Sequence, residues 1–333
     1  MHRHVLVVMF LTICVAGLLP SVHAAERQRT DPVRHYYDVY FWTADAGWVT
    51  DAKDLVLTQD GGRTWTPILS VYGPSRGLGM LNPIGRLSLL VWWFEDAANL
   101  WRSTDQGRTW TSQRLPPNVR GVVFVSPADG WGVQVGGEAF TRTQDGGRTW
   151  QGVSLPGVDT RRLKIQRLTF LSPQVGWAVL SMGTICRTTD GGRTWVLRGK
   201  APSLLRQLVF TDVQTGFALD VDAPKIYRTR DGGATWDTAQ LPPLPDKLPL
   251  QGLFALDPQT AWAVGTRGTL LITTDGGATW QPQASGTSQD LAGIHFTGRQ
   301  HGWAVGFANT ILKTTDGGQT WIKVDDDLKN WQP

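Results

Sequence analysis

Seven aspartates stand in nearly identical surroundings along the chain, and this recurrence raises the question of what chemistry they serve. Each is the third residue of an octet such as TTDGGRTW at 188–195, after a Thr or Ser and before a Trp. The seven are Asp60, Asp105, Asp145, Asp190, Asp231, Asp275 and Asp316. A repeated carboxylate beside glycines is compatible with catalysis, with calcium binding or with an architectural turn.

The octet meets the requirements of a turn better than those of an active site. Catalysis requires different groups to converge on one place, and calcium requires several oxygen ligands per ion, whereas each octet supplies one carboxylate. In a turn, an Asp accepts hydrogen bonds from backbone N–H groups one or two residues on. The glycines permit positive φ, and the Trp clamps the turn onto the sheet. We therefore predict seven structural aspartates, with no catalytic residue and no metal among them.

The spacing of the octets predicts the elements that position them. Successive aspartates are 40 to 45 residues apart, a period typical of repeat architectures. Most repeats also contain a unit such as LTFLSPQVGWAV at 168–179, in which a Phe precedes a Trp or Phe by seven residues. Each repeat shows four short strand patterns and no amphipathic helix. We predict an all-β, seven-bladed β-propeller of four-stranded blades, with the octet between the third and fourth strand of each blade.

Two details of the ring follow from the repeat boundaries. Blade one begins with its own first strand near Val39–Phe41, and blade seven ends with its own fourth strand near Trp321–Val324. This favours closure without an exchanged strand, and the alternative is an extra strand from Arg27–His35. Blade two departs most from the pattern, because Trp92 and Trp93 replace its Gly-Trp pair. The departure is explained either by drift or by aromatics exposed for a ligand.

The ends of the chain are expected to lie outside the propeller, which we place at residues 36–324. Residues 1–24 combine a basic start, an apolar run and a small-residue end, the pattern of a cleaved secretory signal peptide. Residues 325–333 form an acidic tail. Loss of the leader removes Cys14 and leaves Cys186 in an apolar strand pattern, so we expect a buried thiol and no internal disulfide. The expected location is exported, either periplasmic or extracellular.

Positive charge concentrates in repeats three to five, although the whole chain carries a formal net charge of only +4. The densest piece is TRRLKIQRLTF at 160–170, which enters blade four where the inner strands begin. We predict a partner-binding basic patch formed by Arg161, Arg162, Lys164, Arg167, Arg187 and Arg206. The alternative is a solvated loop. One-sided positive charge favours an acidic protein client or an anionic membrane surface, and the export signal argues against nucleic acid.

The octet resembles the Asp-box, or BNR repeat, of sialidases and related propellers. Units such as GWAVGFANTILKTTDGGQTW at 302–321, repeated behind a signal peptide, make the chain similar to the photosystem II stability and assembly factors of chloroplasts and cyanobacteria. The resemblance extends from about Tyr36 to Trp321. It implies a seven-bladed propeller that binds membrane-protein assembly intermediates through an arginine-rich surface, without chemistry or a cofactor. In a photosynthetic source the compartment would be the thylakoid lumen, although the leader lacks the lipid-attachment motif typical of cyanobacterial members.

Two other functions remain compatible with the sequence. A sialidase-like glycosidase would need an arginine triad, a tyrosine nucleophile and a glutamate, but the Arg-Ile-Pro motif is absent and glutamates are few. Those outside the leader are Glu26, Glu95 and Glu138. Glycan binding would use Trp92, Trp93 and Trp101, and a structural envelope component would have no discrete ligand. We expect a non-enzymatic, protein-binding scaffold or assembly factor, with a glycan-binding or glycan-cleaving propeller as the alternative.

Overall fold

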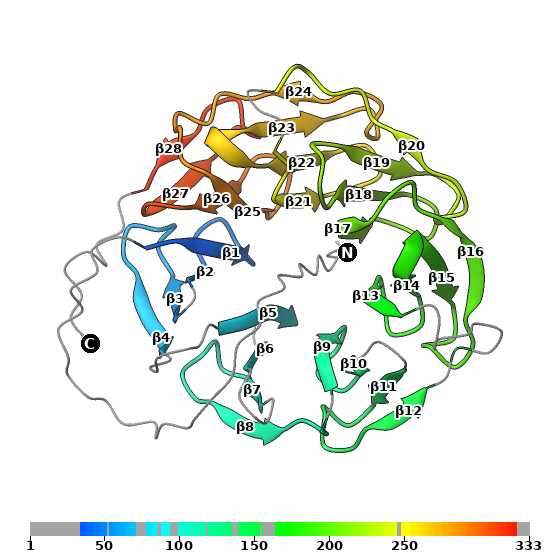
Figure 1. Ribbon diagram of the computed structural model, residues 1–333. Helices are drawn as coiled ribbons and strands as arrows, with labels where there is room; N and C mark the ends of the chain where they lie inside the picture. Colours follow the sequence, from blue (N-terminus) through cyan, green and yellow to red (C-terminus); the bar gives the residue numbers. More distant parts are fainter. Residues whose placement is uncertain are drawn as a thin grey trace.

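A computed structural model of the protein describes residues 34–51, 53–70, 78–84, 88–93, 99–117, 119–134, 139–153, 155, 164–244 and 248–324. These residues form seven four-stranded antiparallel sheets, each made of four consecutive strands, arranged around a ring (Figure 1). The predicted all-β propeller of four-stranded blades is therefore confirmed. We number the sheets 1 to 7 in chain order. The leader, the acidic tail, Arg161 and Arg162 lie outside the described residues.

In every sheet the first strand lies innermost and the fourth outermost (Figure 1). Sheets 1 and 2 contain β1 (Tyr36–Phe41), β2 (Gly47–Asp51), β3 (Asp54–Thr58), β4 (Thr66–Ser70), β5 (Leu78–Ile84), β6 (Ser88–Trp93), β7 (Asn99–Ser103) and β8 (Thr111–Arg114). Sheets 3 and 4 contain β9 (Val119–Phe124), β10 (Gly130–Gln134), β11 (Phe140–Thr143), β12 (Gln151–Val153), β13 (Ile165–Phe170), β14 (Gly176–Leu180), β15 (Thr184–Thr188) and β16 (Val196–Lys200). Sheets 5 and 6 contain β17 (Leu205–Phe210), β18 (Gly216–Asp220), β19 (Ile226–Thr229), β20 (Asp237–Thr238), β21 (Gly252–Ala255), β22 (Ala261–Val264), β23 (Leu270–Thr273) and β24 (Gln281–Pro282). Sheet 7 contains β25 (Leu291–Phe296), β26 (Gly302–Gly306), β27 (Thr310–Thr314) and β28 (Ile322–Lys323), and the short 3-10 turns η1 (Ser181–Gly183) and η2 (Thr266–Gly268) join second to third strands in sheets 4 and 6.

The glycine of the repeated Gly-Trp pair is required by packing. It lies opposite the Phe that ends the first strand of its own sheet, as Gly176 lies opposite Phe170. The Phe ring covers the glycine so closely that a Cβ on Gly176 would come within 2.3 Å of a ring carbon. Gly47 has the same relation to Phe41. Any larger residue would therefore displace the aromatic ring.

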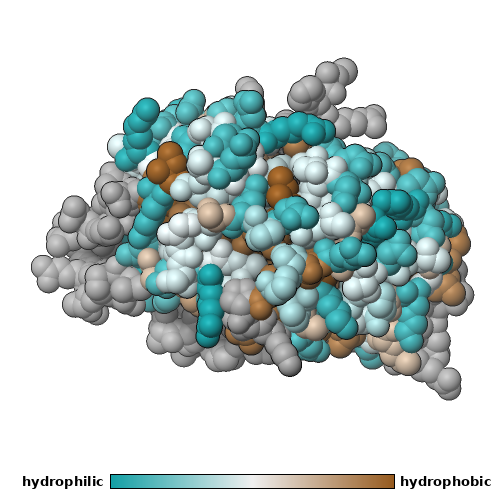
Figure 2. All heavy atoms as spheres, turned by 90° about the horizontal axis from the view of Figure 1, so that it is seen from above, coloured by the Kyte–Doolittle hydropathy of each residue, from teal (hydrophilic) through white to brown (hydrophobic). Residues whose placement is uncertain are grey.

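The tryptophan of this pair packs against the next sheet instead of its own. Trp177 of sheet 4 stacks on Phe210 of sheet 5, with ring centroids 3.6 Å apart and planes 3° from parallel. The same pairing joins sheets 3 and 4, 6 and 7, and 7 and 1. Most of the hydrophobic clusters likewise combine residues of two neighbouring sheets. The core thus lies between the sheets, while the outer side of the ring is mainly hydrophilic with scattered hydrophobic residues (Figure 2).

The ring closes between sheets 7 and 1 without an exchanged strand, because each of these sheets consists of its own four strands. Trp303 stacks on Phe41 across the closure at 3.7 Å. Arg34 adds a second link, because its side chain contacts Asp51 and Asp54 of sheet 1 at 3.2 and 2.9 Å. The backbone of Arg34 is hydrogen-bonded to Asn309, which precedes β27 in sheet 7. The described strands agree with the predicted closure, and most of Arg27–His35, the segment of the alternative, lies outside the described residues.

Candidate protein-binding site

The octets define one face of the ring, and the starts of the first strands define the other. In every sheet except sheet 2, whose corresponding loop lies outside the described residues, the octet is hydrogen-bonded to the loop between the first and second strands, as in the bond from Gly61 N to Asp45 O at 2.7 Å. We call this side the octet face. The opposite side, where the first strands begin and second strands turn into third strands, we call the entry face.

In each octet the aspartate accepts the hydrogen bonds that hold the turn. One carboxylate oxygen accepts the backbone N–H of the Thr four residues on, at 2.9 to 3.0 Å. The other accepts the hydroxyl of the same Thr, at 2.5 to 2.7 Å. The prediction that the donors lie one or two residues on is wrong. The paired glycines, with φ of 73° and 89° at Gly61 and Gly62, curl the chain back so that the fourth residue reaches the carboxylate.

The role of the first octet residue was not predicted from the sequence, although its restriction to Thr or Ser was a visible signal. Thr58 is 1% exposed. Its hydroxyl donates to Asp60 at 2.9 Å and accepts the N–H of Gly62 at 2.9 Å. Burial opposes the charged form of Asp60, but hydrogen bonds from Thr64 and Thr58 lower its pKa to about 2. Each aspartate is thus engaged within its own turn, and the turns are distributed around the ring.

Arg187 belongs to a second repeated contact, which joins neighbouring sheets on the octet face. Its guanidinium lies 5.4 Å from the Trp177 ring, and a Cβ added to Gly232 in the next octet would come within 3.1 Å of it. Lys313 does the same at the ring closure, where it donates to Gly61 O at 3.0 Å. A cation directly precedes the octet in five repeats, at Arg102, Arg142, Arg187, Arg228 and Lys313. That recurrence was the signal that Arg187 serves the contact between sheets.

Two other residues of the predicted basic patch meet on the entry face. Arg167 in β13 donates from Nε to Leu205 O of sheet 5 at 2.7 Å. Arg206 in β17 donates to Val221 O at 3.0 Å. Burial lowers the pKa of Arg167 to about 10, and the like charge of Arg206 adds to the effect. The structure therefore brings Arg167 and Arg206 together at the border of sheets 4 and 5 and sets Arg187 apart from them.

Lys164 and two exposed apolar side chains lie at the same border. The Lys164 backbone exchanges hydrogen bonds with Ser181 at the start of η1, at 3.0 and 2.7 Å. Next to it Met182 is 67% exposed, and Leu204, just before β17, is 52% exposed. We name these residues the entry-face cluster, which comprises Lys164, Arg167, Met182, Leu204 and Arg206.

Asp220 is the acidic residue paired opposite the start of β17, and its carboxylate is occupied within the protein. It accepts the hydroxyls of Ser203 at 2.6 Å and Tyr227 at 2.7 Å. It also accepts two backbone N–H groups of the following turn. Burial opposes ionisation of Asp220, but these hydrogen bonds outweigh it and lower the pKa. The carboxylate therefore serves the turn at the end of β18.

The cysteine and the glutamates that were considered as catalytic residues can be compared with the structure. Cys186 is buried, as predicted, and burial raises the pKa of its thiol to about 11. Glu26, Glu95 and Glu138 lie outside the described residues. In the described part of the chain, no three His, Cys, Asp or Glu side chains group as metal ligands would. The same part contains no helix long and apolar enough to span a membrane.

Comparison with known families now places the chain. The family described as photosynthesis system II assembly factor YCF48 matches residues 115–241 and 243–331, which include sheets 3 to 7. This chain belongs to the YCF48 family. The photosystem II assembly lipoprotein Ycf48 of Synechococcus sp. (strain CC9902) is 30% identical over 122 residues, or 35% of each chain. The chain thus spans about a third of the length of that relative. The predicted family of photosystem II assembly factor-like BNR-repeat propellers is confirmed.

Solved structures share the fold at low identity. YCF48 from Cyanidioschyzon merolae has a TM-score of 0.65 and 19% identity, and covers 89% of this chain and 100% of its own. The structure described as YCF48 bound to D1 peptide has a TM-score of 0.64 and 21% identity, with 88% and 99% covered. A GH74 xyloglucanase from Xanthomonas campestris reaches a TM-score of 0.68 at 14% identity, with 88% of this chain and 55% of that chain covered. At these identities the likeness concerns the fold alone.

Proposed function

We propose that this YCF48-family chain is an exported, non-enzymatic, seven-bladed scaffold that assists the assembly of a membrane protein. It holds an acidic segment of the unassembled client on the entry-face cluster, while the Asp-box turns fasten the ring. The observation that carries the proposal is the pairing of Arg167 and Arg206 beside exposed Met182 and Leu204. Family membership supports the assembly role, and one family structure is described as bound to a D1 peptide.

The chemistry of the cluster suits a peptide that carries both charge and apolar side chains. Two neighbouring guanidinium groups repel one another, and Arg167 is partly stripped of water, as its lowered pKa shows. A carboxylate placed between Arg167 and Arg206 relieves both costs and accepts charge-assisted hydrogen bonds. Met182 and Leu204 offer apolar area next to it, and Met adapts to irregular partners. The client segment is therefore expected to place an acidic residue beside apolar ones.

Arg161 and Arg162 extend the proposed surface on the basis of the sequence. They precede Lys164 in the segment that enters sheet 4. Additional cations near a binding surface raise the rate of encounter with an acidic partner more than they raise the affinity. Charge reversal at these two positions is therefore expected to slow association and to make it less sensitive to salt.

Site-specific photo-crosslinking in the source cell tests the proposal. A photoreactive residue in place of Met182 should form adducts with a membrane protein. Combining it with Lys164→Glu and Arg206→Glu should remove those adducts, because the acidic segment is then repelled. Charge reversal of Arg63, an exposed residue of the sheet 1 octet, serves as the matched control and should leave them intact. Adducts that persist in the Lys164→Glu, Arg206→Glu protein would refute the entry-face assignment.

The glycan alternative has less support. Its structural basis is the likeness to the xyloglucanase, which concerns the fold alone at 14% identity. Of the three tryptophans on which it rests, Trp101 is partly buried against the core of sheet 1. The side chains of Trp92 and Trp93 lie outside the described part of the structure. Turnover of a sialoside or glucan that one carboxylate substitution abolishes would favour this alternative over the scaffold.

A further inference from the structure

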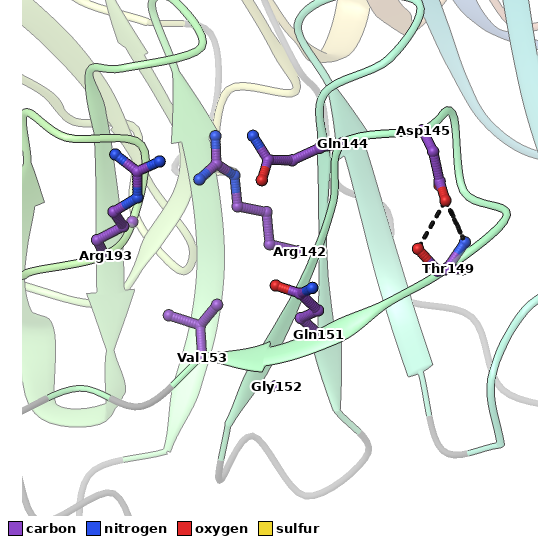
Figure 3. Close-up of a pocket in the computed structure, with 9 residues that line it drawn as sticks. Arg142, Gln144, Asp145, Thr149, Gln151, Gly152, Val153 and Arg193 are labelled. Carbon is purple, nitrogen blue, oxygen red and sulfur yellow. Dashed lines mark hydrogen bonds between the residues drawn. The ribbon is translucent and has the colours of Figure 1, made fainter.

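A polar cleft opens on the octet face between sheets 3 and 4, away from the entry-face cluster. It has a volume of about 420 Å³. Arg142 and Gln144 line it from β11 and its octet, Gln151 and Val153 from β12, and Arg193 from the octet of sheet 4. Figure 3 shows the side chains of Arg142, Gln144 and Arg193 reaching into the same space from the two sheets.

Beside the cleft, Val153 stands at a position where three other sheets have a long polar side chain. In three sheets the residue three positions after the octet Trp is hydrogen-bonded to the octet of the next sheet. At this position Gln113 donates to Gly147 O, Arg198 to Asp231 O at 2.7 Å, and Gln283 to Gly317 O at 3.4 Å. Sheet 3 has Val153 there, which has no hydrogen-bond donor for the octet of sheet 4. The space that a side chain occupies at three other borders is left open beside Val153.

The groups that line the cleft are suited to a carboxylate. Arg142 is held by its stack on Trp131, 5.5 Å from the ring centroid, and its contact with Asp129 is long, at 3.5 Å. Its buried Nε has no hydrogen-bond partner within the described residues. The acid in the wall, Asp145, is bonded to Thr143 and Thr149 of its own octet, as Figure 3 shows for Thr149. Two guanidinium groups therefore face the space without a carboxylate of the protein between them.

The backbone beside the cleft points to a peptide as the source of that carboxylate. The strand β12 is the outer edge of sheet 3, so one side of its backbone is not paired with another strand of the sheet. Its central residue is Gly152, and a Cβ added there would meet nothing within 4 Å. A glycine in an edge strand allows a second backbone to approach closely, and an extended peptide can add to such an edge by main-chain hydrogen bonds.

We propose that the cleft is a second binding site, which takes an extended acidic peptide along β12 and holds one of its carboxylates between Arg142 and Arg193. The amides of Gln144 and Gln151 pair with the peptide next to that carboxylate. The site lies on the opposite face from the entry-face cluster, so one chain can hold two segments at once. The first strands of sheets 3 and 4 run from the entry face to the octet face, and none of their residues lines the cleft.

Titration of the full chain with a fluorescent, acetylated and amidated Val-Thr-Glu-Thr-Val peptide tests the site. Arg193→Gln should weaken binding at least ten-fold, and the peptide with Gln in place of Glu should bind as weakly to the unaltered protein. Arg63→Gln is the matched control, because Arg63 is exposed at the same octet position in sheet 1, and it should change nothing. Arg206→Glu should also leave this binding intact, which separates the result from the fate of the entry-face proposal.

Val153→Gln is the decisive variant. It restores the side chain that crosses the borders after sheets 2 and 6, so it should close the cleft, abolish peptide binding and leave the melting temperature unchanged or higher. Unchanged peptide binding by Val153→Gln, or equal binding of the Glu and Gln peptides, would overturn the proposal. Inorganic phosphate that displaces the peptide at equal concentration would overturn its peptide character, since a simple oxyanion would then satisfy the site.

Discussion

At the border between sheets 4 and 5, Trp177 stacks on Phe210 with centroids 3.6 Å apart. At the next border the corresponding positions hold Phe217 and Ala255, which cannot form that stack. Sheets 5 and 6 still share an apolar core, in which Phe217 meets the edge of Trp280 at 6.5 Å, and they add polar contacts. Gln207 donates to Leu253 O at 2.8 Å and accepts Leu253 N–H at 2.9 Å. An isolated parallel bridge between Gln240 and Thr279 joins their outer edges.

This difference shows that the stack of a Trp on the Phe of the next sheet is one of two ways to hold neighbouring sheets in register. A stacked pair contributes about 0.5–1.5 kcal/mol beyond its buried area. A buried hydrogen bond contributes about 1 kcal/mol net but costs more when one partner is lost. The two borders should therefore respond differently to the same kind of change. Aromatic truncation should be most damaging between sheets 4 and 5, and polar truncation between sheets 5 and 6.

The largest effect is expected from Trp177→Ala. The side chain is fully buried, so its removal leaves a cavity and an unstacked Phe210, and should cost about 4–5 kcal/mol in the free energy of unfolding. Phe217→Ala, the matched change at the next border, should cost nearer to 3 kcal/mol. Urea denaturation of both variants measures the difference. A larger loss for Phe217→Ala would show that the stack is not the main link at the first border.

The next largest effect is expected from Gln207→Leu. Gln207 is 2% exposed and Leu253 is 1% exposed, so the substitution leaves a buried backbone N–H and C=O without partners. Each unsatisfied group costs about 1–3 kcal/mol, and we expect about 2–4 kcal/mol in total. Gln166→Leu is the control on β13, where the side chain is exposed, and it should change stability by less than about 0.5 kcal/mol. Similar losses in the two variants would contradict the polar link.

A third change converts one border into the other. Ala255 lies opposite Ala261, where other sheets place Phe opposite Gly. Ala255→Phe alone should destabilise by about 1–3 kcal/mol, because the ring would meet the Ala261 Cβ in an already packed space. Adding Ala261→Gly should recover part of this loss, while Ala261→Gly alone should be unfavourable. Thermal melts of the four proteins form a double-mutant cycle, and the absence of coupling would show that Phe and Gly are not one packing unit.

Removal of the aspartate should lower the stability by a similar amount in every octet, whereas the effect of removing a residue between sheets depends on the border. Asp190→Ala should cost on the order of 1–2 kcal/mol, because Thr194 loses its acceptor. Hydrogen bonds from Thr194 and Thr188 outweigh burial and lower the pKa of Asp190 to about 2. The carboxylate therefore stabilises the fold above pH 4, and this contribution is lost as the pH falls towards 2. The stability gap between Asp190→Ala and the unaltered protein should narrow over that range, and a constant gap would contradict the assignment.

The repeat pattern predicted the fold because its signals are local and periodic. The octet aspartates, the Phe and Trp seven residues apart, and the Gly before the Trp indicate the strand order in most sheets. The pairing partner of Trp177 was not predictable in the same way, because Phe210 lies in the following repeat. The stack depends on how sheets are placed around the ring, which a period along the chain does not reveal.

The candidate sites show the same division. The density of cations near Lys164 and Arg167 was visible in the sequence, and the predicted patch already included Arg206, which the structure places beside Arg167 from the next sheet. Arg187 looked equivalent by charge, but a third-strand position carries it to the octet face. The cleft beside Val153 was not predicted. Its sequence signal is the valine at a position that holds a glutamine, Gln113 or Gln283, in two other repeats. Comparison of the repeats at the third residue after the octet could have found it.

The smallest effect is expected in the octet of sheet 2, which differs from the others in one backbone position. Gln106 occupies the place of the first glycine and has φ of 64°, a conformation that costs a residue with a side chain about 1–2 kcal/mol. Gln106→Gly removes that strain but adds freedom to the unfolded chain, so a net gain of about 0.5–1 kcal/mol is expected. Gly276→Gln, the reverse change in sheet 6 at φ of 69°, should be destabilising. The Gln106→Gly effect should be additive with those of Trp177→Ala and Gln207→Leu, which lie in other sheets. A Gln106→Gly variant that melts lower than the unaltered protein would mean that the Gln106 side chain stabilises sheet 2 by a contact of its own.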